Sequence, residues 1–345
     1  MSILDRMFGG DAAKRDPNNP NAHSDSDMRQ VIEALLEMNP QPIEMLTPQE
    51  ARLQPTHADA AMKILRARGM DRVADLGVLT QDITYPGAAG ELPARIYRMH
   101  ESEKLHPVVV YFHGGGWVIA NINVYDAGPR AVAKFGDVIV VSVAYRQAPE
   151  DKFPAAHDDA LAAYKWVLEN AQSFGGDPQR VAVMGESAGG NLAAGVAMMA
   201  RDQGLQAPAH MALIYPVAGI DMNTPSYREN ADAKPLNKAT MEWFVKHVFA
   251  DKADLQDPRI NLVEADLRGL PSATVISAEI DPLCSEGETL AERLEAQGVE
   301  VRHKTFHGVT HEFFGMGLVV KDAALAETFV AHELKRAFGT AILPI

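Results

Sequence analysis

The amino-acid sequence predicts an α/β protein with a mostly parallel, eight-stranded sheet covered by helices on both faces. Short apolar runs recur from about residue 78 onward, and several are apolar throughout rather than alternating with polar residues. A strand of a parallel sheet is buried on both faces, so a continuous apolar run is the pattern expected of it. Helical segments lie between most of these runs, and this alternation is typical of a doubly wound sheet.

The strands and helices of this sheet can be placed along the chain. The first two strands, "VLTQDITY" and "ARIYRM", flank a turn that is rich in Pro and Gly. The predicted strands are residues 78–85, 94–99, 108–112, 138–143, 181–184, 211–215, 273–278 and 300–306. The predicted helices that lie between or after them are residues 155–170, 189–202, 285–297 and 324–338.

The first eighty residues lack strand patterns and predict helices instead. Residues 11–27 are polar and rich in Pro, Asn and Asp, so we expect a flexible lead-in there. An amphipathic helix is expected from Met28, a capping box marks another helix start at Thr47, and residues 57–69 predict a third helix. We therefore expect residues 1–79 to form a lead-in and an N-terminal cap segment.

A second part of the cap is expected inside the sheet domain, which we assign to residues 80–345. Residues 216–270 separate two predicted strands by far more chain than a crossover needs. Residues 238–250 within this gap have a helical pattern. We expect residues 217–251 to be an insertion that packs with the N-terminal helices.

Composition narrows the class of protein. The chain of 345 residues has a formal net charge of −14 and no basic run, which argues against a nucleic-acid surface. Its one cysteine, Cys284, cannot form an internal disulfide, as is usual in a reducing compartment. The sequence has no apolar run of about 18 residues and no signal-peptide core at its N-terminus, so we expect a cytoplasmic protein without a membrane segment.

The stretch "VAVMGESAGGNLAAG" places a serine between an apolar strand and an Ala-rich helix. Gly185 and Gly189 flank Ser187 as G-x-S-x-G, and glycine allows a sharper turn than other residues do. Such a turn would hold the serine exposed over the end of the sheet, as a nucleophile requires. The competing interpretation is a tight turn with an incidental serine.

Two further residues follow strands directly, at the sheet edge where α/β proteins bind ligands. Asp281 follows the next-to-last strand, and His311 lies in the loop after the last one. The chain order Ser, Asp, His is that of an α/β-hydrolase triad. A serine hydroxyl needs a base to become a nucleophile, and the base needs a carboxylate to orient it.

Both of these assignments have competitors. Glu279 lies two residues before Asp281 and could face the site instead. His307 lies at the end of the predicted last strand and could be the base. We favour His311 because "GVT", with a bend at Gly308, would supply a loop from which it could reach both partners.

The sequence "HGGGW" follows a third strand. Three consecutive glycines can point bare backbone N–H groups at a developing oxyanion, together with the N–H group that follows the nucleophile. A phosphate-binding loop is the alternative, but no Lys-Ser/Thr follows and no G-x-G-x-x-G spacing is present. The sequence also lacks metal-ligand spacings, so no metal and no cofactor is expected.

Together, HGGGW, GESAG, "DPL" and the late histidine resemble the hormone-sensitive-lipase-like esterases of the α/β-hydrolase superfamily. The resemblance extends over residues 28–338, through stretches such as "VVYFHGGGW" and "VTHEFFGM". It implies an α/β-hydrolase fold with a helical cap. It also implies Ser187 as the nucleophile, Asp281 as the orienting acid and His311 as the base.

The same resemblance implies roles for the residues around the triad. Gly115, Gly116 and Ala188 would supply oxyanion N–H groups, and His113 would brace the glycine loop. The remaining supporting positions of the two motifs are Gly114, Gly185, Glu186 and Gly189. The family more often has Asp where Glu186 stands and usually has an acidic residue where Ser285 stands.

The activity that the resemblance implies is a serine carboxylesterase acting on short- to medium-chain acyl esters through an acyl-enzyme. Its partner would be a small-molecule ester, and the prediction allows for a homodimer. An amidase or an acyltransferase would use the same triad. A receptor without catalysis is a further alternative, because the plant gibberellin receptors resemble this family but lack the catalytic histidine. Here His311 is present, which argues against a receptor.

Overall fold

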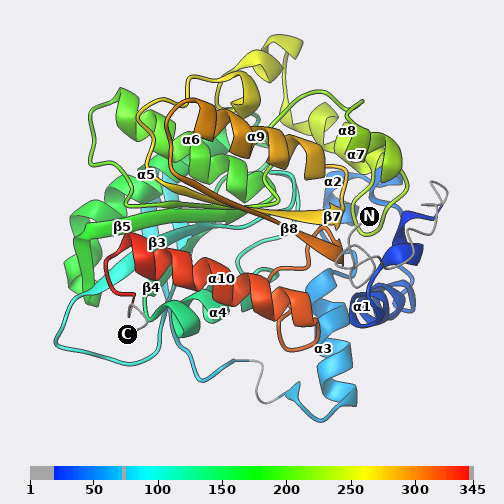
Figure 1. The fold of residues 1–345 in the computed structure, drawn as a ribbon, viewed down its shortest axis with the longest axis horizontal. Coiled ribbons are helices and arrows are strands. Elements are labelled where there is room, and N and C mark those ends of the chain that lie inside the picture. The colour runs from blue at the N-terminus through cyan, green and yellow to red at the C-terminus, as the bar shows by residue number, and fades with distance from the viewer. Residues whose placement is uncertain (1–18, 72–74, 342–345) are drawn as a thin grey trace, which may run out of the picture.

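The computed structural model describes residues 19–71 and 75–341, which form one eight-stranded sheet between layers of helices (Figure 1). The strand order is β1-β2-β4-β3-β5-β6-β7-β8. The α/β-hydrolase fold predicted from the sequence is thereby confirmed. The strands are β1 (Leu79–Gly87), β2 (Gly90–Arg98), β3 (His106–Phe112), β4 (Ile139–Val143), β5 (Gly176–Glu186), β6 (Met211–Ile214), β7 (Ala273–Ile280) and β8 (Val301–Thr310).

The sheet is antiparallel at one edge and parallel elsewhere. Strand β2 pairs antiparallel with β1 and with β4, whereas β3 to β8 pair parallel with their neighbours. In the central strand β3, Val108 and Val110 face one side of the sheet, and Val109 and Tyr111 face the other. All four are fully buried, which explains why the run is apolar without alternation.

Helices cover both faces of the sheet. Helices α5, α6 and α9 pack on one face, and α4 and α10 pack on the other (Figure 1). Their bounds are α4 (Ala127–Gly136), α5 (Ala155–Asn170), α6 (Ala188–Asp202), α9 (Cys284–Ala296) and α10 (Lys321–Ala337). None of the helices in the described ranges has the length and apolar character that crossing a bilayer requires.

The N-terminal helices and the insertion after β6 contact each other across the strand ends. The indole Nε1 of Trp243 donates to the carbonyl of Leu46 at 3.0 Å, and Asn21 and Lys234 exchange two hydrogen bonds of 2.9 Å. These segments contain α1 (Ser26–Leu36), α2 (Pro48–Ala51), α3 (His57–Ala67), α7 (Pro225–Glu229) and α8 (Lys238–Val248). Short 3-10 helices complete the fold: η2 (Pro20–His23), η3 (Ile43–Met45), η5 (Ala171–Phe174), η6 (Lys252–Gln256) and η7 (Leu262–Glu264).

The structure differs from the sequence-based expectations at several boundaries. In the segment expected to be a flexible lead-in, residues 20–23 form η2 and residues 26–27 begin α1, while residues 11–18 lie outside the described residues. The capping box at Thr47 is present, but the helix that it starts is only one turn long. Strand β5 is longer than expected because its first residues pair with β3 beyond a register shift.

The turn between β5 and α6 brings backbone atoms very close together. A Cβ atom on Gly185 would lie 2.1 Å from the carbonyl oxygen of Gly189, and one on Gly189 would lie 2.0 Å from that of Phe112. Both oxygens belong to the backbone, so neither can move aside cheaply. The two glycines of G-x-S-x-G are therefore required by packing against β3 and within the turn itself.

This crowding predicts how two substitutions in α6 change the stability of the protein. Gly189→Ala is expected to lower the free energy of unfolding by about 3 kcal/mol or more, because overpacking against backbone cannot relax. The Cβ atom added by Gly195→Ala would contact only the ring of His157, at 3.3 Å. This substitution should change the free energy of unfolding by less than about 1 kcal/mol, because helix propensity favours alanine. Urea unfolding of both variants tests this; equal stabilities would contradict it.

Candidate active site

Ser187 occupies the tip of the turn between β5 and α6, in a backbone conformation that is rare for residues other than glycine. Its φ is 56° and its ψ is −119°. The N–H group of Ser187 donates to the carbonyl of Ile214 at 2.9 Å, which fastens the turn to β6. The expectation of an exposed serine is wrong, since Ser187 is only 5% exposed beneath the segments that cover the strand ends.

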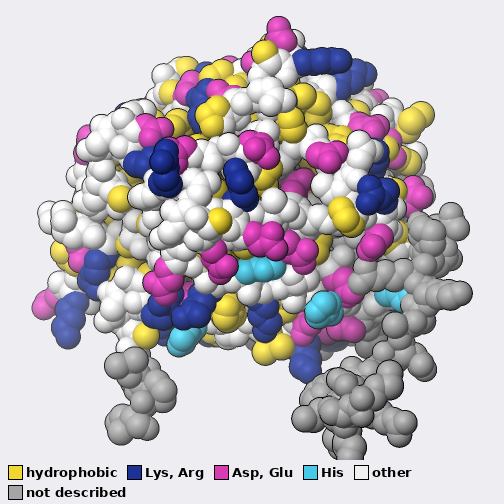
Figure 2. Space-filling view, turned by 45° about the horizontal axis from the view of Figure 1, so that its top comes forward, with side chains coloured by type: hydrophobic (Ala, Val, Ile, Leu, Met, Phe, Trp, Pro, Cys, Tyr) yellow, Lys and Arg dark blue, Asp and Glu magenta, His cyan; other side chains and the backbone are white. Residues whose placement is uncertain are grey.

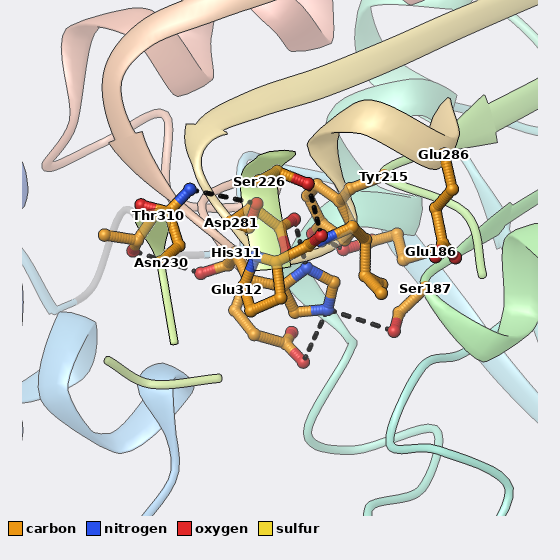
Figure 3. Close-up of polar contacts among 12 residues, drawn as sticks. Glu186, Ser187, Tyr215, Ser226, Asn230, Asp281, Glu286, Thr310, His311 and Glu312 are labelled. Carbon is orange, nitrogen blue, oxygen red and sulfur yellow. Dashed lines mark hydrogen bonds and ion pairs between the residues drawn. The ribbon is translucent and has the colours of Figure 1, made fainter. Parts of the chain in front are cut away.

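The side chains of Ser187, His311 and Asp281 form a hydrogen-bonded chain (Figure 3). Ser187 Oγ lies 3.0 Å from His311 Nε2, and His311 Nδ1 lies 2.6 Å from Asp281 Oδ2. The other oxygen of Asp281 accepts the N–H group of Leu283 at 2.9 Å. All three side chains are buried, so the structure brings together the three residues that the sequence singled out.

The two competitors contact each other rather than Ser187. His307 Nδ1 lies 3.4 Å from Glu279 Oε2, and the His307 side chain is 78% exposed. The expectation of a loop at "GVT" is wrong, because β8 continues through Thr310 and its register with β7 shifts near Ile280. Gly308 has a φ of +70° within this irregular stretch, and His311 follows the end of the strand directly.

The electrostatic surroundings of His311 favour its charged form. Burial by itself lowers the pKa of the imidazole, but the carboxylates of Asp281 and Glu312 outweigh this effect. The net result is a pKa above the ordinary histidine value. An imidazole poised in this way can accept a proton and hold the resulting charge.

A second buried carboxyl group belongs to Glu186, which directly precedes Ser187 in the chain. It accepts hydrogen bonds from the hydroxyl groups of Tyr111 and Tyr215. Burial raises the pKa of Glu186 to about 8, so this group is mostly protonated at neutral pH. The ring of Tyr215 also packs against His311 with centroids 4.5 Å apart, so the two tyrosines connect Glu186 to the imidazole and the sheet.

The loops around Asp281 are held by side chains that the sequence-based reasoning did not identify. Asn230 donates to the carbonyl of Asp281 at 3.3 Å, and the hydroxyl of Ser226 donates to that of Pro282 at 2.6 Å. The carboxyl of Glu286 accepts the N–H group of Ala218 at 2.8 Å. Ser226 and Asn230 lie in or next to α7, in the insertion, so no local motif could have linked them to Asp281.

The glycine loop after β3 reaches the same site. Gly115 and Gly116 have φ values of +98° and +59° and line a cavity that also contains Ser187. His113 Nδ1 lies 2.7 Å from the carbonyl oxygen of Gly114, and the ring of Tyr145 stacks on the imidazole at 4.4 Å. Burial lowers the pKa of His113 to about 4, so the ring is neutral and braces the loop without adding charge.

Two cavities meet at Ser187. The larger, of about 290 Å³, lies between the glycine loop and the N-terminal helices and is also lined by His311 and Glu312. The smaller, of about 60 Å³, lies under the insertion, and its side-chain lining is almost entirely apolar. The site therefore has one roomy chamber with a mixed polar and apolar lining and one small apolar chamber, and both border Ser187.

Glu312 is a residue of this site that no sequence motif identified. It follows His311 with a φ of +71°, and its carboxylate accepts a hydrogen bond from Tyr125 at 2.6 Å. His57 Nδ1 lies 3.5 Å from this carboxylate, and His311 Nε2 lies 4.0 Å from it (Figure 3). Its sequence position next to the base was the only available signal.

Comparison with known proteins identifies relatives of this chain. A family profile described as the α/β-hydrolase fold matches residues 109–315. Carboxylesterase NlhH of Mycobacterium tuberculosis is 40% identical over 267 residues, covering 76% of this chain and 83% of that protein. Ethyl acetate hydrolase of Pseudomonas putida is 34% identical over 299 residues, covering 86% and 92%.

Solved structures of esterases are also similar to this chain. The hyperthermophilic esterase from the archaeon Pyrobaculum calidifontis superposes with a TM-score of 0.79 at 35% identity, covering 90% of this chain and 96% of that one. Fold, site and relatives together define a carboxylic ester hydrolase. The chain belongs to the hormone-sensitive-lipase-like esterases of the α/β-hydrolase superfamily.

The raised pKa of His311 predicts the pH dependence of turnover. A protonated imidazole cannot accept the proton of Ser187, so kcat/KM should fall as the pH drops, with a midpoint above the ordinary histidine value of about 6.5. Glu312→Gln removes one of the charges that raise this pKa, so the midpoint should move to lower pH. Glu292→Gln, on the exposed side of α9, is the matched control; equal midpoints in both variants would contradict the prediction.

Proposed function

We propose that the protein hydrolyses short- to medium-chain acyl esters through an acyl-enzyme, with Ser187 as the nucleophile. The observation that carries this proposal is the buried chain from Ser187 Oγ through His311 to Asp281, with spacings of 3.0 Å and 2.6 Å. This arrangement lets the imidazole accept a proton at one nitrogen while the other stays bound to a carboxylate.

In the first half of the reaction, His311 takes the proton of Ser187 as Oγ attacks the ester carbonyl carbon. Negative charge develops on the carbonyl oxygen, and we assign its stabilisation to the N–H groups of Gly115, Gly116 and Ala188. Ala188 is the first residue of α6, so its N–H group has no partner within the helix. His311 then gives its proton to the departing alcohol oxygen, which leaves an acyl group on Ser187.

In the second half, a water molecule replaces the alcohol. His311 takes a proton from the water as its oxygen attacks the acyl carbon, and Ser187 Oγ leaves with that proton. Asp281 holds the imidazole in one orientation throughout and stabilises its positive form. The chain ends each cycle unchanged, and the reaction needs no cofactor.

The size of the apolar chamber supports a short acyl group. Its volume of about 60 Å³ is closed off by Met222, Val245 and other apolar side chains of the insertion. The name of the Pseudomonas putida relative, ethyl acetate hydrolase, also refers to a short acyl group. We infer an acyl chain of about two to six carbons, because such chains can bury their apolar surface there.

The surface supports a small-molecule partner rather than a polyanion. Figure 2 shows Lys and Arg side chains spread over the visible face among Asp and Glu, not gathered into one patch. With a net charge of −14, the chain would repel a phosphate backbone.

The triad predicts a specific ranking of variants. Ser187→Ala and His311→Ala should each lower kcat by about four to six orders of magnitude, and the double variant should be scarcely slower than either, because triad members act as a unit. His307→Ala should keep at least a tenth of kcat, since His307 contacts Glu279 at the surface. Steady-state rates with 4-nitrophenyl acetate test this; the reverse ranking of the two histidines would assign the base to His307.

The acyl-chain preference is tested by a rate series. We expect kcat/KM on 4-nitrophenyl esters to peak between acetate and hexanoate and to fall steeply for longer chains, because the small chamber cannot admit them. Replacing Met222 by Ala should enlarge the chamber and move the peak toward longer chains. Faster cleavage of hexadecanoyl than of butanoyl esters would overturn this part of the proposal.

A further inference from the structure

We propose that this esterase prefers substrates whose alcohol half carries a positive charge, and that the carboxylate of Glu312 binds that charge. The inference rests on the proposed hydrolysis at Ser187 and adds a substrate class to it. It follows from the direction in which the alcohol must leave and from the charges that line the chamber on that side.

The two chambers can be assigned to the two halves of the ester. His311 must deliver its proton to the alcohol oxygen, so that oxygen has to lie beside Nε2 when the ester bond breaks. The larger chamber is lined by His311 and Glu312, whereas neither residue lines the smaller one. The alcohol half therefore occupies the larger chamber, and the acyl half occupies the small apolar one.

Within the larger chamber, the carboxylate of Glu312 lies close to where the alcohol begins. Oε1 of Glu312 is 4.0 Å from His311 Nε2, the same ring nitrogen that faces Ser187 (Figure 3). The leaving oxygen approaches Nε2 to about 3 Å. A cationic group about two or three carbon–carbon bonds of ~1.5 Å beyond that oxygen can therefore contact the carboxylate.

Two histidines lie within ion-pair distance of this carboxylate: His57 Nδ1 is 3.5 Å from it and His311 Nε2 is 4.0 Å from it. Among the described residues that line the chamber, Glu312 is the only Asp or Glu and Arg52 is the only Lys or Arg. The guanidinium of Arg52 is bound to Glu150 at 2.7 Å and to the carbonyls of Val118 and Ala148. Tyr125 donates to Glu312 and fixes its direction without changing its charge.

Two other features suit a cationic ligand. The rings of Tyr125 and Phe244 line the chamber, and aromatic faces attract alkylammonium groups. Glu312 also holds a left-handed backbone conformation, which costs free energy in a residue with a long side chain. A glycine would fit this φ without strain, so backbone geometry does not explain the carboxylate at this position.

The test compares esters that differ only in charge. The first pair carries the charge on the alcohol half: 2-(trimethylammonio)ethyl acetate and its neutral isostere 3,3-dimethylbutyl acetate. The second pair carries it on the acyl half: ethyl 4-(trimethylammonio)butanoate and ethyl 5,5-dimethylhexanoate. The readout is the ratio of kcat/KM between charged and neutral members, measured at low salt on the alkaline plateau of the pH profile.

We expect the charged ester of the first pair to be favoured by about fivefold or more, the range of a partly desolvated cation site. Glu312→Gln should bring this ratio close to one, and Glu292→Gln should leave it as it is. In the second pair the charged ester should be disfavoured, because the small chamber is apolar. A purely structural effect of Glu312→Gln would lower both rates equally and leave the ratio unchanged.

A measurement on the unsubstituted protein keeps the proposal testable if Glu312→Gln fails to fold. Choline should inhibit hydrolysis of 4-nitrophenyl acetate more strongly than 3,3-dimethylbutan-1-ol does. Equal inhibition, an unchanged ratio in Glu312→Gln, or preference for charge on the acyl half would each overturn the inference while hydrolysis stands. If none of the neutral esters is hydrolysed, the proposed function itself fails and the inference falls with it.

Discussion

The turn between β5 and α6 is the constraint on which the rest of the site depends. It holds Ser187 in a backbone conformation that costs of order 1–3 kcal/mol and that persists only because its surroundings leave no alternative. Gly185 and Gly189 allow carbonyl groups to approach where no Cβ atom would fit, and the Ser187 N–H group binds the carbonyl of Ile214. Ser187 is thereby fixed relative to β5 and β6, and His311 reaches it from the end of β8.

Buried carboxyl groups surround that turn, and burial divides their roles. The pKa values of Glu186 and Glu286 are raised to about 8, so at neutral pH these groups act mainly through hydrogen bonds. Asp281 is oriented by partners on both of its oxygens, His311 Nδ1 and the N–H group of Leu283. Because Glu186 and Glu286 are mostly neutral, they can lie near the carboxylate of Asp281 without repelling it.

The substrate chambers belong to segments that are far apart in the sequence. The large chamber lies between the glycine loop, α3 and the segment after β8, whereas the small one lies beneath the insertion. Hydrogen bonds between Trp243 and Leu46, and between Asn21 and Lys234, join the N-terminal helices to the insertion. These hydrogen bonds hold together the two segments whose other residues line the chambers.

The sequence by itself determined the sheet, its helices and the chemical residues, because these depend on local signals. Buried strands read as apolar runs, and the crowded turn at Ser187 demands its two glycines in sequence. The tertiary structure alone decided that Ser187 is buried, that β8 runs on to Thr310, and that the carboxylate of Glu312 lies 4.0 Å from His311 Nε2. Each of these features depends on contacts between segments that are distant in the sequence. Such contacts are the pairing of β7 with β8, the helices that cover the site and the direction of the Glu312 side chain. They leave no periodic pattern in the sequence.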